Sequence, residues 1–236
     1  MKISGLQKLT LLDYPGRVAC TVFLNGCNFR CPYCHNSQLL EAGVEPVMTV
    51  EELLAFLRKR QCILEGVCIT GGEPTLHPQL FDLLRAVKDL GYSVKLDTNG
   101  YRPEVLQKVL DLGLVDYVAM DIKNSPAAYG ETVGLAAPDL TKIEESIRLL
   151  LEGRVDYEFR TTVVLPLHSE ETISHMARWL QDLGNGRKAK RLFLQPFVDR
   201  DTVPVAGFSA PDSDQLNIFS ALIASCAEEV AFRGVK

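Results

Sequence analysis

The chain has 236 residues, of which 47% are hydrophobic and 23% are charged, and its formal net charge is −5. This composition is typical of a globular protein and excludes disorder throughout the chain. The small negative charge excludes a general electrostatic affinity for nucleic acid or anionic membranes, so neither is an expected partner.

The cellular compartment and the distribution of the cysteines together indicate what the cysteines do. The start of the chain shows no secretory or anchoring pattern, and no apolar run is long enough to cross a bilayer, so we expect a cytoplasmic protein. In that compartment, clustered cysteines indicate metal binding or catalysis rather than disulfides. Isolated cysteines in apolar surroundings are expected in the core, and these are Cys20, Cys62, Cys68 and Cys226.

Six β-branched runs alternate with six amphipathic stretches. The predicted strands span residues 18–24, 67–70, 92–97, 115–121, 157–164 and 191–195. The predicted helices span residues 49–60, 79–90, 103–112, 139–152, 170–183 and 212–232. This order implies parallel strands with right-handed crossovers, in a doubly wound sheet or in a complete or partial barrel.

Six units are fewer than the eight of a complete TIM barrel. The predicted fold is therefore α/β, a single-domain partial (β/α)6 TIM-like barrel with parallel strands. We expect one domain over residues 1–236, in which 1–17 lead into a barrel core at 18–200.

Three cysteines, Cys27, Cys31 and Cys34, follow the first predicted strand within eight residues. Cys31 to His35 fits the C-x-x-C-H pattern of haem attachment, which belongs to exported proteins. A structural zinc site needs a fourth ligand, and no second ligand pair follows at a useful distance. An iron-sulfur cluster held by three thiolates leaves one iron open, as reactive metal sites do. The spacing favours this third interpretation over the other two.

The spacing C-x-x-x-C-x-x-C, with Tyr33 before the last cysteine, resembles the signature of the radical S-adenosylmethionine (SAM) superfamily. The resemblance implies one 4Fe-4S cluster on Cys27, Cys31 and Cys34, which are then the metal-binding and catalytic residues. It also implies that the amino and carboxylate groups of SAM bind the open iron, with Tyr33 beside the adenine.

Further candidate residues follow the second predicted strand, in a loop that opens on the catalytic face of a barrel. Gly71 and Gly72 allow close approach of the backbone to a ligand, and Glu73 is able to accept a hydrogen bond from an ammonium group. An ordinary turn is the alternative for such a segment. The resemblance assigns these three residues to the methionyl amino group of SAM.

Charged residues end the third and fourth predicted strands. Asp97 and Thr98 end the third, and Asp121 and Lys123 end the fourth with side chains on one side of an extended chain. A buried Asp–Lys ion pair is the alternative for the second pair. The resemblance to glycyl-radical activating enzymes implies that Asp121 and Lys123 contact the ribose and carboxylate of SAM. It further implies a monovalent-cation site near Asp97 and Asp121.

The fifth predicted strand contributes two more cofactor-binding candidates. Arg160 is spaced to point inward to a carboxylate, with an outward solvated arginine as a nearly equal alternative. His168 follows the strand, where a contact with ribose competes with an incidental position in a loop.

Residues 11–19 (LLDYPGRVA) and the segment from Phe23 to Asn36 resemble anaerobic ribonucleoside-triphosphate reductase activating proteins. The resemblance covers residues 5–200 with decreasing specificity. It implies an oxidoreductase that takes one electron from a flavodoxin or ferredoxin, cleaves SAM reductively, and generates a glycyl radical on the partner reductase. The alternatives are another glycyl radical enzyme such as pyruvate formate-lyase, whose activators carry a histidine where this chain has Val198, or radical chemistry on a small molecule.

Overall fold

The computed structural model describes residues 1, 3–40 and 45–234. Its strands are β1 (Ile3–Thr10), β2 (Ala19–Leu24), β3 (Gly66–Gly71), β4 (Ser93–Thr98), β5 (Tyr117–Asp121), β6 (Asp156–Val163), β7 (Ala189–Pro196) and β8 (Ala227–Phe232). Its α-helices are α1 (Val50–Arg58), α2 (Leu80–Asp89), α3 (Pro103–Asp111), α4 (Tyr129–Val133), α5 (Leu140–Leu151), α6 (Glu170–Gly184) and α7 (Ser213–Ile223). Two 3-10 helices, η1 (Ser37–Leu39) and η2 (Pro74–Leu76), follow β2 and β3.

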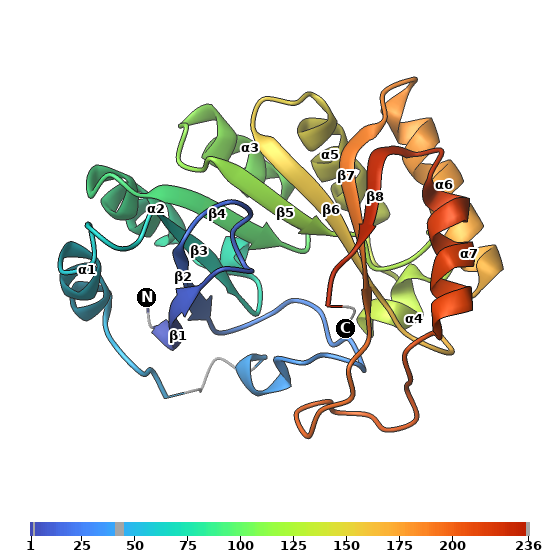
Figure 1. The fold of residues 1–236 in the computed structure, drawn as a ribbon, viewed down its shortest axis with the longest axis horizontal. Coiled ribbons are helices and arrows are strands. Elements are labelled where there is room, and N and C mark those ends of the chain that lie inside the picture. The colour runs from blue at the N-terminus through green and yellow to red at the C-terminus, as the bar shows by residue number, and fades with distance from the viewer. Residues whose placement is uncertain (2, 41–44, 235–236) are drawn as a thin grey trace.

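The strands form one curved sheet in the order β1-β2-β3-β4-β5-β6-β7-β8. Neighbouring strands from β2 to β8 pair in parallel, whereas β1 pairs antiparallel with β2. The connecting helices cover the outer side of the sheet (Figure 1). Among the described residues β8 does not pair with β1, so the barrel stays open. The predicted α/β partial barrel with parallel strands is confirmed.

The helices dock through apolar stripes that match the helical period. In α2 the buried residues are Leu80, Leu83, Leu84 and Val87, a spacing that places them on one face. The side chains of β2, β3 and β5 are mostly buried on both faces, as in a parallel sheet covered by helices. None of the helices in the described ranges is long and apolar enough to span a membrane.

The sheet extends beyond both boundaries of the predicted barrel core. Residues 3–10, expected as a lead-in, form β1 and pair with β2. The predicted helix at 212–232 is wrong in its second half, because α7 ends at Ile223 and residues 227–232 form β8. Alanine and glutamate favour a helix there, but pairing with β7 satisfies the backbone groups of that strand, so tertiary context overrides local propensity.

Candidate active site

The loop after β2 carries the three clustered cysteines at the carboxyl end of the barrel. Cys31 is buried, and Cys27 and Cys34 are half-buried. All three line one cavity of about 260 Å³. The ends of β3 to β7 contribute the rest of its wall, which includes Thr70, Gly71, Gly72, Glu73, Asp97, Thr98, Asn99, Asp121, Lys123, Arg160, Thr162 and Gln195. Segments distant in the sequence thus meet where the βα loops of a barrel open.

Hydrogen bonds shape the cysteine loop. The Phe29 amide donates to Cys27 Sγ over 3.4 Å, and the Cys34 amide donates to the Cys31 carbonyl over 3.1 Å. Arg30 Nη1 donates to the carbonyl oxygens of Cys27 and Phe29, at 2.6 and 2.8 Å. These hydrogen bonds give the loop a defined shape. In the described part of the chain, no three His, Cys, Asp or Glu side chains meet closely enough to hold a single metal ion.

The segment after β7, residues 197–210, packs against the cysteine loop, and we call it the strap. The His35 ring stacks on Phe197 with centroids 5.4 Å apart, and its Nε2 lies 2.7 Å from the Val198 carbonyl oxygen. Thr202 Oγ1 donates to the His35 carbonyl over 2.7 Å. The Val205 amide donates to the Pro32 carbonyl over 3.3 Å. His35 thus joins the loop to the strap.

The thiols are protonated in the metal-free protein. Burial raises the pKa of Cys27 to about 11 and that of Cys31 to about 12, and it also raises the pKa of Cys34. Metal binding therefore has to displace protons from these sulfur atoms, because the thiolate is the ligand.

Gly71 and Gly72 line the cavity, but their small size is needed because the backbone at the start of the cysteine loop packs directly against them. A methyl group on Gly71 would lie 2.1 Å from the Leu24 carbonyl oxygen, and one on Gly72 would lie 2.0 Å from the Gly26 carbonyl oxygen. Gly71 also has a φ of +130°, which favours glycine. The expected close approach exists, but its partner is the start of the cysteine loop.

We expect Gly72→Ala to destabilise the protein, because the new methyl group overlaps backbone that cannot move aside easily. Overpacking of this kind costs about 1–3 kcal/mol. Urea unfolding of the variant measures the loss. Gly184→Ala is the matched control, since its methyl group would meet nothing closer than Leu151 Cδ1 at 3.9 Å. Equal stability of the two variants would contradict the steric account.

Glu73 is buried and anchors two neighbouring loops. Its Oε1 accepts hydrogen bonds from the Thr75 amide, Thr75 Oγ1 and Thr98 Oγ1, at 3.1, 2.6 and 2.8 Å. Its Oε2 accepts from the Asn99 amide over 2.6 Å. Burial raises the pKa of Glu73, although these donors lower it in part. With a single donor, Oε2 keeps a lone pair for a group in the cavity.

Four charged candidates form one ion-pair network. Arg160 Nη1 lies 3.1 Å from Asp97 Oδ2, and its Nε lies 2.9 Å from Asp121 Oδ1. Lys123 Nζ lies 2.9 Å from Asp121 Oδ2. The arginine thus points inward, and Asp121 and Lys123 are ion-paired as well as exposed to the cavity.

The same network controls the protonation of the carboxyl groups. Burial alone would raise the pKa of Asp97, but Arg160 and Lys95 lower it to about 2. Burial likewise opposes ionisation of Asp121, and Arg160 and Lys123 bring its pKa below the ordinary value. Both carboxyl groups are therefore ionised at neutral pH.

Tyr33 and His168 differ in their relation to the cavity. Tyr33 lines it, and its buried hydroxyl has no hydrogen-bond partner among the described residues. His168 does not line it and is buried behind Lys123. Since its Nε2 lies 2.9 Å from the Lys123 carbonyl oxygen, Nε2 donates and Nδ1 accepts from the Val164 amide. Burial lowers the pKa of His168, so the ring is neutral and holds backbone rather than reaching ribose.

Comparison with known proteins identifies the family. A family model described as the Radical SAM superfamily matches residues 21–183. The chain belongs to the radical SAM superfamily. The "Putative glycyl-radical enzyme activating enzyme" of Methanocaldococcus jannaschii is 36% identical over 187 residues, which cover 76% of this chain and 75% of that protein. This relative and the pyruvate formate-lyase-activating enzyme described next support an enzyme of the glycyl-radical-enzyme activating class.

Two further relatives are named for different activities. The pyruvate formate-lyase-activating enzyme of Clostridium pasteurianum is 34% identical over 128 residues, or 52% of each chain. The 7-carboxy-7-deazaguanine synthase of Thermococcus kodakarensis is 30% identical over 211 residues, covering 80% of this chain and 76% of that one. A crystallised domain of a Bacteroides vulgatus pyruvate-formate lyase-activating enzyme shares the fold, with a TM-score of 0.58, 22% identity and coverage of 72% and 99%.

Radical SAM enzymes use a 4Fe-4S cluster and SAM, and the residues that line the cavity match the chemistry of both groups. Its wall combines three thiols, the ligands of iron-sulfur clusters, with both signs of charge for an amino acid moiety. The orphaned hydroxyl of Tyr33 indicates that a polar group is missing from this site.

Several residues in and behind the wall were absent from the sequence-based list. Asn99 Nδ2 donates to Asn28 Oδ1 over 2.9 Å and so joins the loop after β4 to the cysteine loop. Thr162 and Gln195 line the cavity from β6 and β7. Lys95 contacts Asp97 from within β4. Strand alternation was an available signal for Lys95 and Thr162, because each lies two residues from a predicted site residue and shares its face.

Proposed function

We propose that this radical SAM enzyme generates a glycyl radical on an anaerobic ribonucleoside-triphosphate reductase. The observation that carries the proposal is the single cavity in which three thiols face the Arg160 network. The sequence resemblance in residues 11–19 and 23–36 favours the reductase as partner. The name of the archaeal relative supports the activation of a glycyl radical enzyme.

In the proposed site Cys27, Cys31 and Cys34 hold the cluster, which supplies one electron for cleavage of SAM when both are bound. Tyr33 lies beside the adenine, and Glu73 Oε2 accepts from the amino group. Gly71 and Gly72 place the backbone of their loop close to that group. Each residue has a matching position in the cavity wall.

The ion-pair network suits the carboxylate of SAM. Asp97 and Asp121 carry two negative charges, and Lys123, Arg160 and the adjoining Lys95 carry three positive ones, so these five residues together have a formal charge of +1. Lys123 and Arg160 line the cavity and present this excess to it. The family resemblance also implies a monovalent cation near Asp97 and Asp121, and that cation stays a prediction. The positive charge of this arrangement disfavours it.

The overall reaction consumes one electron and one SAM for each hydrogen atom removed from a glycine α-carbon. Methionine and 5′-deoxyadenosine leave, and the partner keeps the unpaired electron. We propose that a flavodoxin or ferredoxin provides the electron and that the reaction takes place in the cytoplasm. The open barrel supports a protein substrate, since its mouth is not enclosed by a complete ring of strands.

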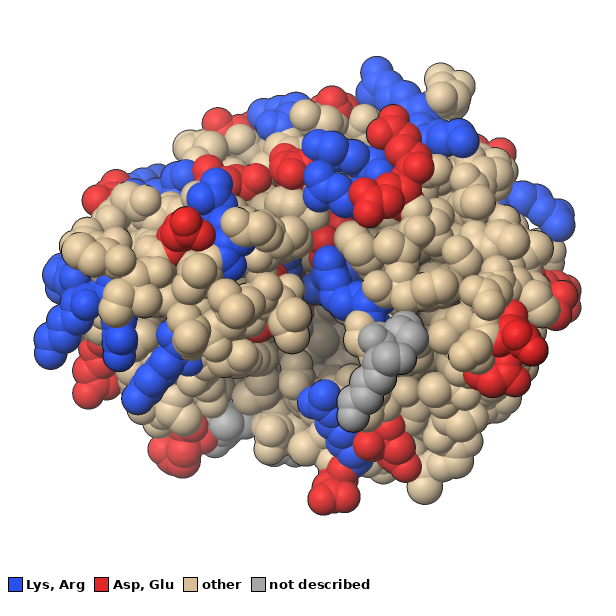
Figure 2. All heavy atoms as spheres, viewed as in Figure 1, with Lys and Arg blue, Asp and Glu red and all other residues tan. Residues whose placement is uncertain are grey.

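Surface charge on the face shown in Figure 2 sets no strong preference for an acidic or basic partner. Figure 2 shows Lys and Arg side chains interspersed with Asp and Glu over the face it presents, which is hollowed near its centre. Recognition of the partner therefore depends on shape and local contacts more than on a field of one sign.

The test is an anaerobic assay of the enzyme reconstituted with iron and sulfide, reduced, and supplied with SAM. We expect 5′-deoxyadenosine to form and a glycyl radical signal to appear in electron paramagnetic resonance when the reductase is added. If the radical forms on pyruvate formate-lyase and not on the reductase, the proposed partner is wrong and the proposed activity stands.

Radical chemistry on a small molecule is the second candidate. The likeness to a 7-carboxy-7-deazaguanine synthase over 80% of the chain favours it. It predicts that a metabolite, rather than a glycyl radical enzyme, stimulates 5′-deoxyadenosine formation. A screen of both kinds of substrate in the same assay decides between the two functions.

A further inference from the structure

Lys95 is a fully buried lysine inside the barrel. Its side chain is 1% exposed, and it lies two residues before Asp97 on the same face of β4. Its ammonium group contacts Asp97 Oδ1, and its Nζ lies 3.8 Å from Cys68 Sγ on β3. A buried ammonium requires a compensating charge, and Asp97 is the carboxylate in contact with it.

Every oxygen of the two carboxyl groups expected to bind a monovalent cation already contacts a cationic side chain. Lys95 and Arg160 occupy the two oxygens of Asp97, and Arg160 and Lys123 occupy the two oxygens of Asp121. Because three cationic groups already surround two carboxylates, a fourth positive charge would be repelled. The residues present therefore do not fit a monovalent cation at this position.

An ammonium group carries the same single charge as K⁺ or Na⁺, and here the chain holds it in place. Lys95 does not line the cavity, so it acts on bound SAM through Asp97 and Arg160. Its charge holds Asp97 ionised, and Asp97 in turn orients Arg160 Nη1 over 3.1 Å. The aligned guanidinium then faces the cavity.

We propose that Lys95, together with Arg160, takes the place of the monovalent cation that the family resemblance implies, so that SAM binding here needs neither K⁺ nor Na⁺. Lys95 is then a positioning residue for the SAM carboxylate. The inference rests on the assignment of the cavity to SAM and is independent of which glycyl radical enzyme is the partner.

The wild-type enzyme provides the first test. SAM cleavage is measured as 5′-deoxyadenosine in K⁺, Na⁺ and choline salts of equal ionic strength, and thermal unfolding of the cluster-free protein is followed in the same three salts. We expect the three rates to agree and the melting temperature to show no rise specific to K⁺ or Na⁺. A rate about tenfold higher in K⁺ or Na⁺, or a cation-specific rise in melting temperature, would overturn the proposal.

The variant Lys95→Met is the second test, because it removes the only cationic partner of Asp97 Oδ1 among the described residues, leaves that oxygen with the Cys68 thiol at 3.6 Å, and opens space for a small cation. We expect the variant to cleave SAM slowly in choline and about tenfold faster in K⁺ or Na⁺, and its cluster-free form to melt higher in those salts. Lys95→Arg, which restores the charge, is expected to regain independence of the salt. A purely structural lysine predicts equal losses in all three salts, and that result would contradict the proposal.

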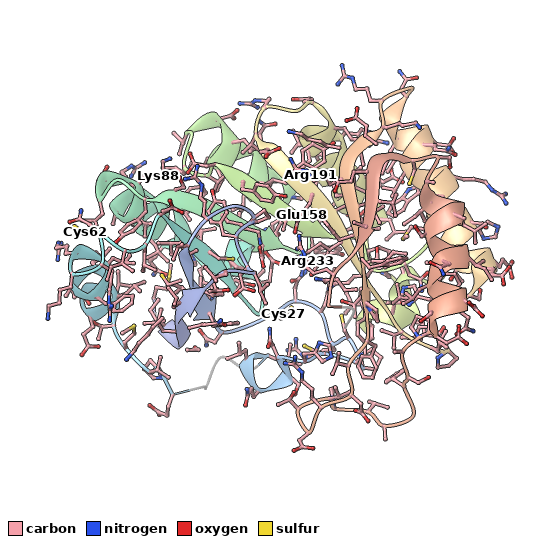
Figure 3. The ribbon with its side chains drawn as sticks, in the orientation of Figure 1. Cys27, Cys62, Lys88, Glu158, Arg191 and Arg233 are labelled. Carbon is pink, nitrogen blue, oxygen red and sulfur yellow. The ribbon has the colours of Figure 1, made fainter. Side chains whose placement is uncertain are left out.

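Lys88→Met is the matched control, since it also removes a lysine from an Asp–Lys pair. Lys88 Nζ lies 2.7 Å from Asp116 Oδ1, and Lys88 is on α2, away from Cys27 (Figure 3). We expect its SAM cleavage to stay the same in all three salts. If no SAM cleavage occurs in any salt, the assignment of the cavity to SAM is wrong. The melting temperatures in the three salts then still test whether the protein binds K⁺ or Na⁺.

Discussion

Cys31→Ala is expected to abolish cluster assembly and SAM cleavage. Cys31 is the most buried of the three thiols in the cavity, and no other cysteine lines the cavity within the described ranges. Loss of a partner that merely supports a metal ligand costs about 10- to 100-fold, so loss of the ligand itself is expected to exceed about 100-fold. Iron and sulfide analysis and 5′-deoxyadenosine formation measure the two effects.

Cys62→Ala is the control for that experiment. Its surroundings in the sequence predict a buried thiol, but this prediction is wrong because Cys62 is exposed after α1. Figure 3 shows it at the left edge of the molecule, away from Cys27. We expect full cluster content and unchanged cleavage. Cleavage that survives Cys31→Ala at the rate of Cys62→Ala would disprove the three-cysteine cluster.

Arg160→Met is expected to destabilise the cluster-free protein and to weaken SAM binding. The arginine side chain is 13% exposed and bridges two carboxylates, so its loss leaves both with one partner fewer. Breaking a buried ion pair costs about 3–5 kcal/mol, and Lys95 and Lys123 remain, so we expect about 3 kcal/mol. Urea unfolding measures the stability, and equilibrium dialysis of the reconstituted enzyme measures SAM binding.

Arg154→Met is the control, because it removes an ion-paired arginine that lies outside the network. Arg154 pairs with Asp111 over 2.7 Å, but the two side chains are 40% and 52% exposed. Exposed pairs contribute about 0–1 kcal/mol, so we expect little change in stability and none in SAM binding. A similar loss for both variants would show that Arg160 has no special bridging role.

The barrel is predictable from the sequence because its strands are short apolar runs separated by helices with regular apolar stripes. Ile69 and Val118 lie in such runs and are fully buried. The edge strands are less predictable. β1 is half-exposed and carries Gly5, and β8 contains Glu228 and Glu229, which are exposed. Their strand conformation comes from pairing with β2 and β7, which no local pattern reveals.

The site is predictable to the extent that its residues end parallel strands, since those ends converge. Asp97, Asp121 and Arg160 meet for this reason. The contacts inside the set were not predictable. That Arg160 bridges two carboxylates, or that His168 holds the Lys123 carbonyl, depends on the register of neighbouring strands and on side-chain packing.

Charged residues that line a hollow can also form ion pairs that only stabilise the fold. A second hollow near the amino ends of the strands is lined by Arg17, Arg191 and Arg233. Arg233 donates to both oxygens of the buried Glu158, at 2.5 and 2.9 Å, and Arg191 contacts Asp156 over 3.2 Å. Figure 3 shows Glu158 between Arg191 and Arg233. Arg191 and Arg233 are therefore paired within the protein, and they tie β7 and the end of β8, respectively, to β6.

The contacts between the strap and the cysteine loop determine when, during synthesis of the chain, the loop becomes ordered. His35 and Ser37, beside the cysteines, take hydrogen-bond partners in Val198 and Thr202, more than 160 residues later in the chain. During synthesis the ribosome therefore releases the three cysteines long before the residues that brace their loop. A nascent chain holds flexible, exposed thiols, and the braced loop arises only once the strap has emerged. Delivery of iron and sulfide to this protein is accordingly expected to follow completion of the chain, and a ribosome-bound fragment that lacks the strap is a poor acceptor.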